Sequence, residues 1–293
     1  MKLDIDTSQY RYPTQKEYDD AKKFIIRREN YASILESRIE TILTDAAGQI
    51  AQICFKYNIP ANAFTLTANE KMFQEICDVM DEAEEDILSL IDEFSTASTK
   101  DNGIKKLIAL WITTLGKGNM NLRQTLEGYM NRYLYDVEAI VAAYKLAMEN
   151  NPKLTQAKAI SQIKSSQKSI YTNPYVISAM KGAQAAQMAA RYIRTHGVHR
   201  DDVPLPIVGS SNSNMNNVKA MAGTTLRMAW MREQMMEFRD AGAKGYLQMR
   251  GSSYPCAVCD DETGIHQGDF NAMLNDPYPH PNCCCFRVPL FEP

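Results

Sequence analysis

The sequence predicts a mainly α-helical protein, in which a bundle of long helices precedes a small α+β C-terminal domain that a zinc-type Cys/His site clamps. Apolar residues recur every three or four positions over most of the first 195 residues, which is the period of amphipathic helices. Residues 196–217 are rich in proline and small polar residues, which is typical of a linker. Five of the seven cysteines lie in the last forty residues. We therefore expect a helical body at 1–195, a linker at 196–217 and a metal-clamped domain at 218–293.

Capping and breaking residues set the helix boundaries. Thr14–Glu17 and Thr67–Glu70 are capping-box patterns that begin the first two helices, and Asp101 precedes the third. Asn173 before Pro174 begins the last helix of the body. The first helix is longer than is usual in a globular protein, so it needs partners along its length. The predicted helices span about 14–56, 67–94, 104–115, 121–148, 155–170, 173–193 and 218–241, and a short strand follows at 246–249.

Charge is distributed unevenly along the chain, although the net charge is only -3. Residues 61–100 carry ten acidic and two basic residues, whereas residues 151–200 carry eight basic and no acidic residues. One interpretation is two solvated helical faces that attract each other. The other is that the basic segment meets nucleic acid or an acidic partner, because phosphate binding relies on clustered lysine and arginine. No base-reading motif accompanies the segment, so only non-specific contact is predicted.

The cellular compartment expected from the sequence indicates how the cysteines are used. The first residues contain no apolar signal sequence, and no stretch reaches the roughly 18 apolar residues that a membrane span requires. We therefore expect no membrane association and a reducing cytosol. In that compartment clustered cysteines bind metal or take part in catalysis more often than they form disulfides, and an odd number fits a disulfide framework poorly.

Two short cysteine knuckles predict a tetrahedral metal site. A C-x2-C turn directs two sulfurs at one ion about 2.3 Å away, and a second knuckle supplies the remaining ligands. Adjacent residues of an extended chain point in opposite directions, so three consecutive cysteines do not all bind one ion. We expect one structural Zn2+ per chain, held by Cys256, Cys259 and His280 plus either Cys283 or Cys285, with His266 as a substitute candidate. Cysteines that stay reduced and bind no metal are the alternative.

The sequence supports a catalytic function less well than it supports a structural metal site. Pro255–Cys259 matches the P-C-x-x-C half of the zinc deaminase pattern, but no H-x-E supplies the other half. A metal-dependent nuclease of the ββα-metal type also combines cysteine knuckles with histidines, and it remains the alternative function. No Asp-His pair lies between the knuckles, and the chain ends soon after Cys285. The sequence therefore predicts a protein that is not an enzyme.

The order of these residues resembles a known family. C-x2-C, a glycine at 264, a proline-rich approach and then H-P-N-C-x-C are similar to the C-terminal domain of phage Mu F-like minor head proteins, the phage head morphogenesis family. The resemblance covers about residues 215–290. This chain has Cys284 where the family usually has a basic residue, which leaves the choice among the three consecutive cysteines open. The matching residues are Cys256, Cys259, His280, Cys283 and Cys285.

The resemblance implies a function in virus assembly. It implies a low-copy structural component of a tailed phage or prophage, located in the virion and, during assembly, in the host cytoplasm. Its partners would be the portal protein and other head proteins, and residues 151–200 could lie near packaged DNA. The expected role is in head assembly or in DNA delivery.

Overall fold

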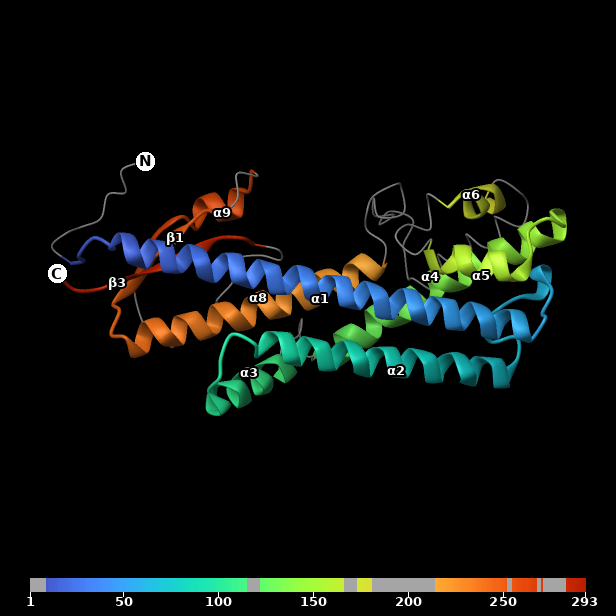
Figure 1. Cartoon of the computed structure of the whole chain (residues 1–293), viewed down its shortest axis with the longest axis horizontal. Helices are drawn as coiled ribbons and strands as arrows, with labels where there is room; N and C mark the ends of the chain where they lie inside the picture. Colours follow the sequence, from blue (N-terminus) through green and yellow to red (C-terminus); the bar gives the residue numbers. More distant parts are fainter. Residues whose placement is uncertain are drawn as a thin grey trace. The chain divides into compact units, whose positions relative to one another are not determined.

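The computed structural model describes residues 9–114, 122–165, 173–180, 214–251, 255–267, 270 and 283–293. Over these residues the protein is mainly helical and has a small antiparallel sheet near the C-terminus (Figure 1), as the sequence predicted. The helices are α1 (Gln15–Lys56), the short 3-10 turn η1 (Ala61–Ala63), α2 (Glu70–Ser95), α3 (Asn102–Thr114), α4 (Leu122–Asn150), α5 (Gln156–Ser165), α6 (Pro174–Met180), α8 (Asn214–Asp240) and α9 (Ala257–Asp261). The strands are β1 (Gly245–Met249), β2 (Gly264–Gln267) and β3 (Phe286–Leu290).

Three of the predicted helix starts are capped by the expected residues. The backbone N–H of Thr14 donates to the Glu17 carboxylate at 2.7 Å, and the N–H of Glu17 donates to Thr14 Oγ1 at 3.3 Å, so the capping box of α1 is confirmed. The side chain of Asp101 accepts two backbone N–H bonds from the first turn of α3. Asn173 does the same for α6.

Two predicted boundaries are wrong by a few residues. α2 begins at Glu70, because Asn69 rather than Thr67 accepts a backbone N–H of the first turn, at 3.0 Å. α8 begins at Asn214 rather than at 218, and the Asn214 amide donates to Asp136 at 2.8 Å, so the last residues of the predicted linker are helical. The predicted helical segments 166–170 and 181–193 and the linker residues 196–213 lie outside the described residues.

The chain divides into two compact units. Unit 1 comprises residues 1–36, 90–114 and 220–293, and unit 2 comprises residues 37–89 and 115–219. Unit 1 therefore combines both ends of the chain, whereas the sequence predicted a linear order of body, linker and C-terminal domain. That linear division stays a prediction, because most of the expected linker is not among the described residues.

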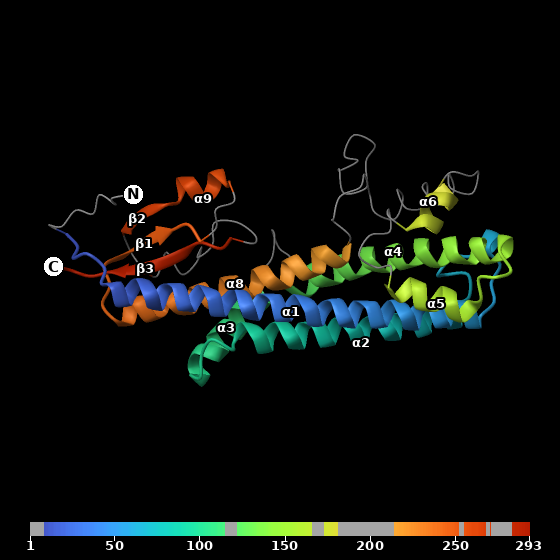
Figure 2. The same ribbon diagram turned by 45° about the horizontal axis from the view of Figure 1, so that its top comes forward.

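The sheet of unit 1 is antiparallel with the strand order β2-β1-β3. Figure 2 shows β1 between its two neighbours. Tyr246 of β1 is paired with His266 of β2 on one side and with Pro289 of β3 on the other. Only β1 was predicted from the sequence. β3 contains a proline, which an edge strand tolerates because one row of its backbone groups has no partner.

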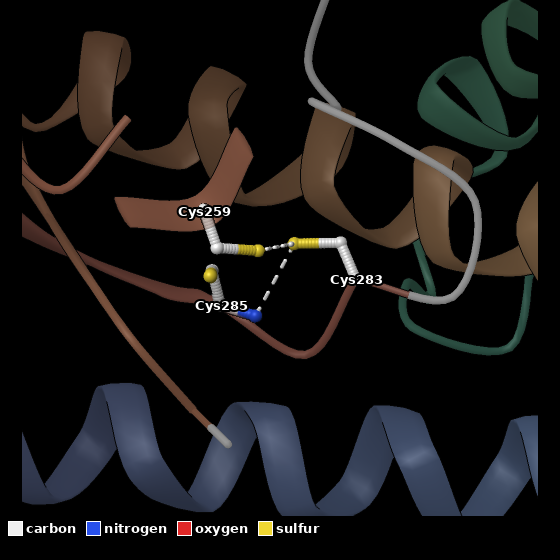
Figure 3. Close-up of side chains that lie close together, drawn as sticks. All are labelled: Cys259, Cys283 and Cys285. Atoms are coloured by element: carbon white, nitrogen blue, oxygen red, sulfur yellow. Dashed lines mark hydrogen bonds between the residues drawn. The ribbon is translucent and has the colours of Figure 1, made fainter. Parts of the chain in front are cut away.

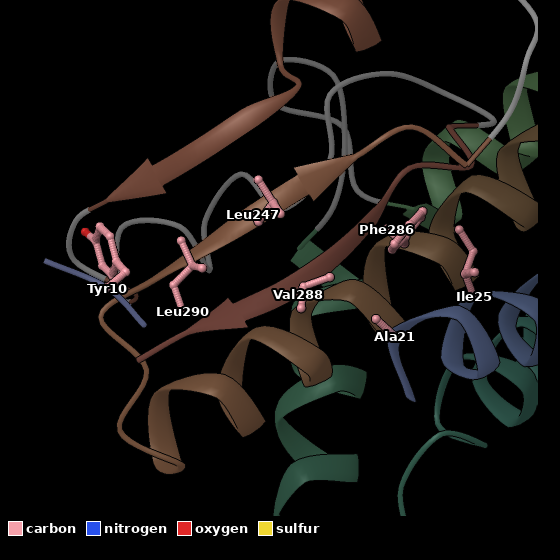
Figure 4. Packing of buried hydrophobic residues seen from close by; sticks show 7 residues of the cluster. All are labelled: Tyr10, Ala21, Ile25, Leu247, Phe286, Val288 and Leu290. Carbon is pink, nitrogen blue, oxygen red and sulfur yellow. The ribbon is translucent and has the colours of Figure 1, made fainter. Parts of the chain in front are cut away.

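An apolar core joins this sheet to the start of the chain (Figure 4). Side chains from α1 and from the segment before it pack with side chains of β1 and β3. A backbone hydrogen bond of 3.0 Å from Arg11 to the Phe291 carbonyl adds to this contact. The buried members are Tyr10, Ala21, Ile25, Leu247, Phe286, Val288 and Leu290.

Trp230 is the centre of the helical part of unit 1. Its side chain is fully buried, and its indole N–H donates to the Phe94 carbonyl at 2.9 Å. The Tyr31 ring of α1 lies 5.1 Å from the indole. Met231, Met235 and Met236 of the same helix are also buried, and their flexible side chains help to fill the core.

Unit 2 is built from the second part of α1 with α2, α4 and α5. Tyr133 is buried, and its hydroxyl donates to the Leu43 carbonyl at 2.6 Å. Lys145 is also buried, with its ammonium 4.8 Å from the centre of the Phe55 ring and 2.9 Å from the Ile59 carbonyl oxygen that it donates to. These polar atoms are buried with a partner, as a stable core requires.

The described ion pairs of unit 2 do not join the two charged segments. Glu75 and Glu85 of α2 pair with Lys56 of α1 and Arg123 of α4, at 2.9 Å and 2.6 Å. Lys164, from the basic segment, pairs with Asp45 of α1. Other basic residues of that segment lie outside the described residues: Lys168, Lys181, Arg191, Arg194 and Arg200. None of the helices in the described ranges has the length and apolar character needed to cross a bilayer.

Candidate metal centre

Two short segments of unit 1 bring the cysteines together. Cys256 is the N-cap residue of α9 with an extended backbone, and Cys259 lies within that single helical turn. The Cys256 carbonyl accepts the Asp260 N–H at 2.9 Å, which closes the turn between the two cysteines. Cys283 and Cys285 lie immediately before β3. The first knuckle thus lies at the start of α9 and the second immediately before β3, and both belong to unit 1.

Three thiols lie at the spacing that one metal ion requires (Figure 3). The sulfurs of Cys259, Cys283 and Cys285 all lie within 4.8 Å of one another, and those of Cys259 and Cys283 are 3.8 Å apart. Tetrahedral zinc with bonds of about 2.3 Å separates its sulfurs by roughly 3.8 Å. The three residues are 5%, 2% and 4% exposed. No described cysteine forms a disulfide. Three buried cysteines are therefore close enough to bind one metal ion.

Cys284 points away from this cluster. It packs against the apolar core that contains Phe286 and Val288 instead. The alternation of an extended chain explains the difference, because residues of even number before and within β3 face this core and residues of odd number face the opposite side. The same alternation, visible in the sequence as Cys284, Phe286, Val288 and Leu290, is a signal that the sequence analysis did not use to separate the three cysteines.

Backbone N–H groups surround the sulfurs. Cys285 donates its N–H to the sulfur of Cys283 at 3.4 Å, and Gly251 donates its N–H to the sulfur of Cys285. Gly251 is so close to the second knuckle that an added Cβ would lie 1.7 Å from the Cys284 carbonyl oxygen. Only glycine allows this approach. Donors of this kind stabilise thiolate more than thiol, because a hydrogen bond to the charged form favours that form.

The thiols of the cluster differ strongly in acidity. Burial raises the pKa of Cys259 to about 12, and the hydrogen bond to Cys285 together with burial raises the pKa of Cys283 still further. The hydrogen bond from Cys283 lowers the pKa of Cys285 to about 6. Burial and the hydrogen bonds within the cluster therefore favour the thiolate form at Cys285 over Cys259 and Cys283. A metal ion would displace the remaining protons, so its binding would release protons to the solvent.

Cys256, a predicted ligand, lies beside the three thiols but is not one of those whose sulfurs lie within 4.8 Å of one another. Its side chain packs against the cluster of Met231, Cys259, Cys283 and Cys285, and it interacts with Cys259 through a side-chain hydrogen bond. The other predicted ligand, His280, lies outside the described residues.

The substitute candidate His266 is engaged elsewhere. Its ring stacks on Tyr246 with the ring centres 4.8 Å apart. One of its ring nitrogens is hydrogen-bonded to the Glu262 carbonyl at 2.7 Å. It is not part of the cysteine cluster that the described residues form.

A buried arginine from the other end of the chain touches the centre. Arg28 of α1 is fully buried, and its Nη2 donates to the Cys283 carbonyl at 3.1 Å. At the outer edge, Arg250 forms an ion pair with Asp260 of α9. The sequence analysis missed Arg28, because no local pattern indicates a contact between residues separated by 255 positions.

Known proteins give no independent assignment. No protein-family model, no curated protein and no solved structure matches the chain. The family resemblance of the cysteine pattern therefore stays a prediction. The chemistry of the site stands on its geometry alone, which is that of three buried cysteines close enough to bind one metal ion.

Proposed function

We propose that this chain is a structural minor head protein of a tailed phage or prophage, and that one Zn2+ clamps its C-terminal domain. The observation that carries the proposal is the order C-x2-C, then H-P-N-C-x-C, in a domain where Cys259, Cys283 and Cys285 converge. The protein would be a low-copy component of the virion that binds the portal and other head proteins during assembly in the host cytoplasm.

The donor set supports zinc as the resident ion. Thiolates are soft ligands, and a site of buried cysteines with tetrahedral spacing is typical of Zn2+. The sheet next to the knuckles is small, with three strands of four or five residues each. Binding of a structural zinc contributes on the order of 10 kcal/mol to folding. Zinc would therefore add to the apolar contacts that hold this sheet against α1.

Burial supports a structural role over catalysis. A catalytic zinc keeps one coordination position open to water or substrate. The sulfurs of Cys259, Cys283 and Cys285 are instead packed against Met231 and are almost fully covered. Exposed apolar side chains are present elsewhere in unit 1, at Ile26, Leu107 and Leu110, which suits a protein that binds other proteins.

Two measurements on purified protein and virions test the proposal. Elemental analysis of protein purified reduced and without chelator should give one zinc per chain, and Cys259→Ser should lower it while Cys54→Ser, in another part of the fold, should not. Mass spectrometry should find the protein in intact virions, and it should co-elute with purified portal rings. Absence from virions together with no portal binding would refute the head-protein proposal.

Nuclease activity is the competing outcome. Wild-type protein incubated with DNA and Mg2+ or Zn2+ should leave the DNA intact. Cleavage that disappears in Cys259→Ser or His280→Ala, at unchanged helical content, would replace the proposal by a metal-dependent nuclease. A DNA-binding titration at two salt concentrations separates non-specific contact through residues 151–200 from both results, since phosphate contacts weaken steeply with salt.

A further inference from the structure

Two arginines are buried in unit 1 with part of their guanidinium group unsatisfied. Arg28 of α1 is 0% exposed and Arg287 of β3 is 3% exposed. In each, the Nη1 atom is buried and has no hydrogen-bond partner among the described residues. A guanidinium stays charged at all ordinary pH values, and burying a charge that no opposite charge compensates is costly. The pair therefore points to a negative group that the described residues do not supply in full.

The carboxylate next to Arg28, that of Glu29, also pairs with a second arginine. The Nε of Arg28 donates to Glu29 at 2.9 Å, but the other oxygen of Glu29 accepts from Arg227 at the same distance. The Nη2 of Arg28 lies 2.9 Å from the same Glu29 oxygen as its Nε and also donates to the Cys283 carbonyl at 3.1 Å. One end of this guanidinium therefore lies directly on the backbone of the cysteine knuckle.

The positive charge of Arg287 has still less compensation from negative groups of the described residues. Its Nε donates to the neutral Gln248 side chain at 3.1 Å, and its guanidinium carbon lies 4.7 Å from the centre of the Tyr246 ring. No carboxylate of the described residues lies within ion-pair distance, although Glu262 acts at longer range. The cysteine at 283 and the guanidinium of Arg28 are electrostatic neighbours of Arg287.

Strand alternation places Arg287 on the same side of the chain as the cluster. Residues 283, 285 and 287 share one face, because the residues of even number face the apolar core. Two positive charges therefore border the cysteines, one from each end of the chain. Like charges that are neighbours in a buried region repel each other unless a negative group lies between or beside them.

We propose that the metal-loaded thiolate centre is that negative group, so that Arg28 and Arg287 are its counter-ions and the metal fastens α1 to the C-terminal sheet. The proposal rests on the zinc site proposed above. A divalent ion bound by three thiolates carries one net negative charge, and with Cys256 as the fourth thiolate it carries two. Each thiol that binds releases its proton to the solvent. Metal binding therefore fixes the sulfurs as thiolates beside the two guanidinium groups.

Arg287→Met tests the proposal because it should maintain or raise the stability of the metal-free protein and yet weaken zinc binding. Methionine has similar length and no charge, so the metal-free variant should unfold at the same or a higher temperature than metal-free wild type. The same change should weaken zinc binding about 10-fold or more, measured by competition with a chelator in reducing buffer. Arg28→Met should weaken zinc binding in the same way. Arg239→Met, which removes an exposed arginine paired with its neighbour Asp240, is the matched control and should change neither quantity.

Hydrogen exchange supplies the second measurement. Removal of zinc from the wild type should increase amide exchange in residues 15–36, whereas α4 should be unaffected because it belongs to unit 2. If Arg287→Met lowers the unfolding temperature equally with and without zinc, or leaves zinc affinity unchanged, Arg287 is only a packing residue and the counter-ion proposal is wrong. If wild-type protein holds no zinc at all, the underlying zinc site is wrong, which is a different and separable result.

Discussion

Replacing Glu233 by glutamine should make stability less dependent on pH. Glu233 lies on α8 and is 3% exposed, and its Oε2 has no hydrogen-bond partner. Burial raises the pKa of this carboxyl from 4.5 to about 7, helped by the nearby charge of Glu237. A hydrogen bond from the Thr99 side chain and the positive charge of Arg27 act in the opposite direction but are weaker.

The sign and size of the effect follow from proton linkage. Between pH 4.5 and 7 the folded state binds the Glu233 proton more tightly than the unfolded state does, so the free energy of unfolding falls as pH rises. Each pKa unit corresponds to 1.36 kcal/mol, which gives a loss of about 3 kcal/mol that is complete above pH 7. Glutamine has the shape of the protonated acid and carries no charge, so it avoids this loss.

Urea unfolding at pH 5 and pH 8 measures the effect directly. Glu233→Gln should match the wild type within about 1 kcal/mol at pH 5 and exceed its unfolding free energy by up to about 3 kcal/mol at pH 8. Glu82→Gln, at an exposed position of α2, should show no such gain and serves as the control. The argument is refuted if Glu233→Gln has the helical content of the wild type but is no more stable than the wild type at pH 8. In that case the ionised Glu233 carboxylate does not lower the free energy of unfolding.

The other predictions concern glycine and a helix cap. Gly251→Ala should destabilise unit 1 by several kcal/mol and abolish zinc binding, because the new Cβ meets the Cys284 carbonyl. Gly128→Ala has free space on the exposed side of α4 and should stabilise the protein by about 1 kcal/mol. Urea titration of both variants measures this difference in stability. Glu17→Ala removes the Arg11 ion pair and half of the capping box and should cost about 1 kcal/mol at pH 7. The bonds from Arg11 lower the pKa of Glu17 to about 2, so this loss should shrink as pH falls from 4.5 towards 2, followed by thermal unfolding.

Local signals explain what the sequence predicted well. The period of apolar residues predicted the long helices of the described chain but not the short η1 and α9, and caps such as Thr14 and Asp101 placed helix starts, because both signals act within one or two turns. The first cap of α2 was misplaced because Thr67 and Asn69 both suit a cap, and only the packing of the helix decides between them. The strand predicted at 246–249 matches β1 to within one residue.

Contacts between distant parts of the chain explain what the sequence did not predict. The grouping of residues 1–36 with 220–293 depends on side chains such as Ile25, Phe286 and Leu290, none of which is unusual in its own segment. β2 and β3 escaped detection since the first has four residues and the second contains an arginine and a proline. Their pairing is fixed by β1 rather than by their own propensity.

The choice among the three consecutive cysteines is set by the strand that follows them. Phe286, Val288 and Leu290 must face the apolar core, and moving an extended chain by one residue would turn all three towards the opposite side. That cost fixes Cys284 on the core side and leaves Cys283 and Cys285 for the metal centre. Hydrophobic burial several residues away therefore decides which cysteines of the second knuckle are available as the proposed ligands. The same alternation places Arg287 on the side of Cys283 and Cys285, so the apolar pattern of β3 selects both the proposed ligands and their proposed counter-ion.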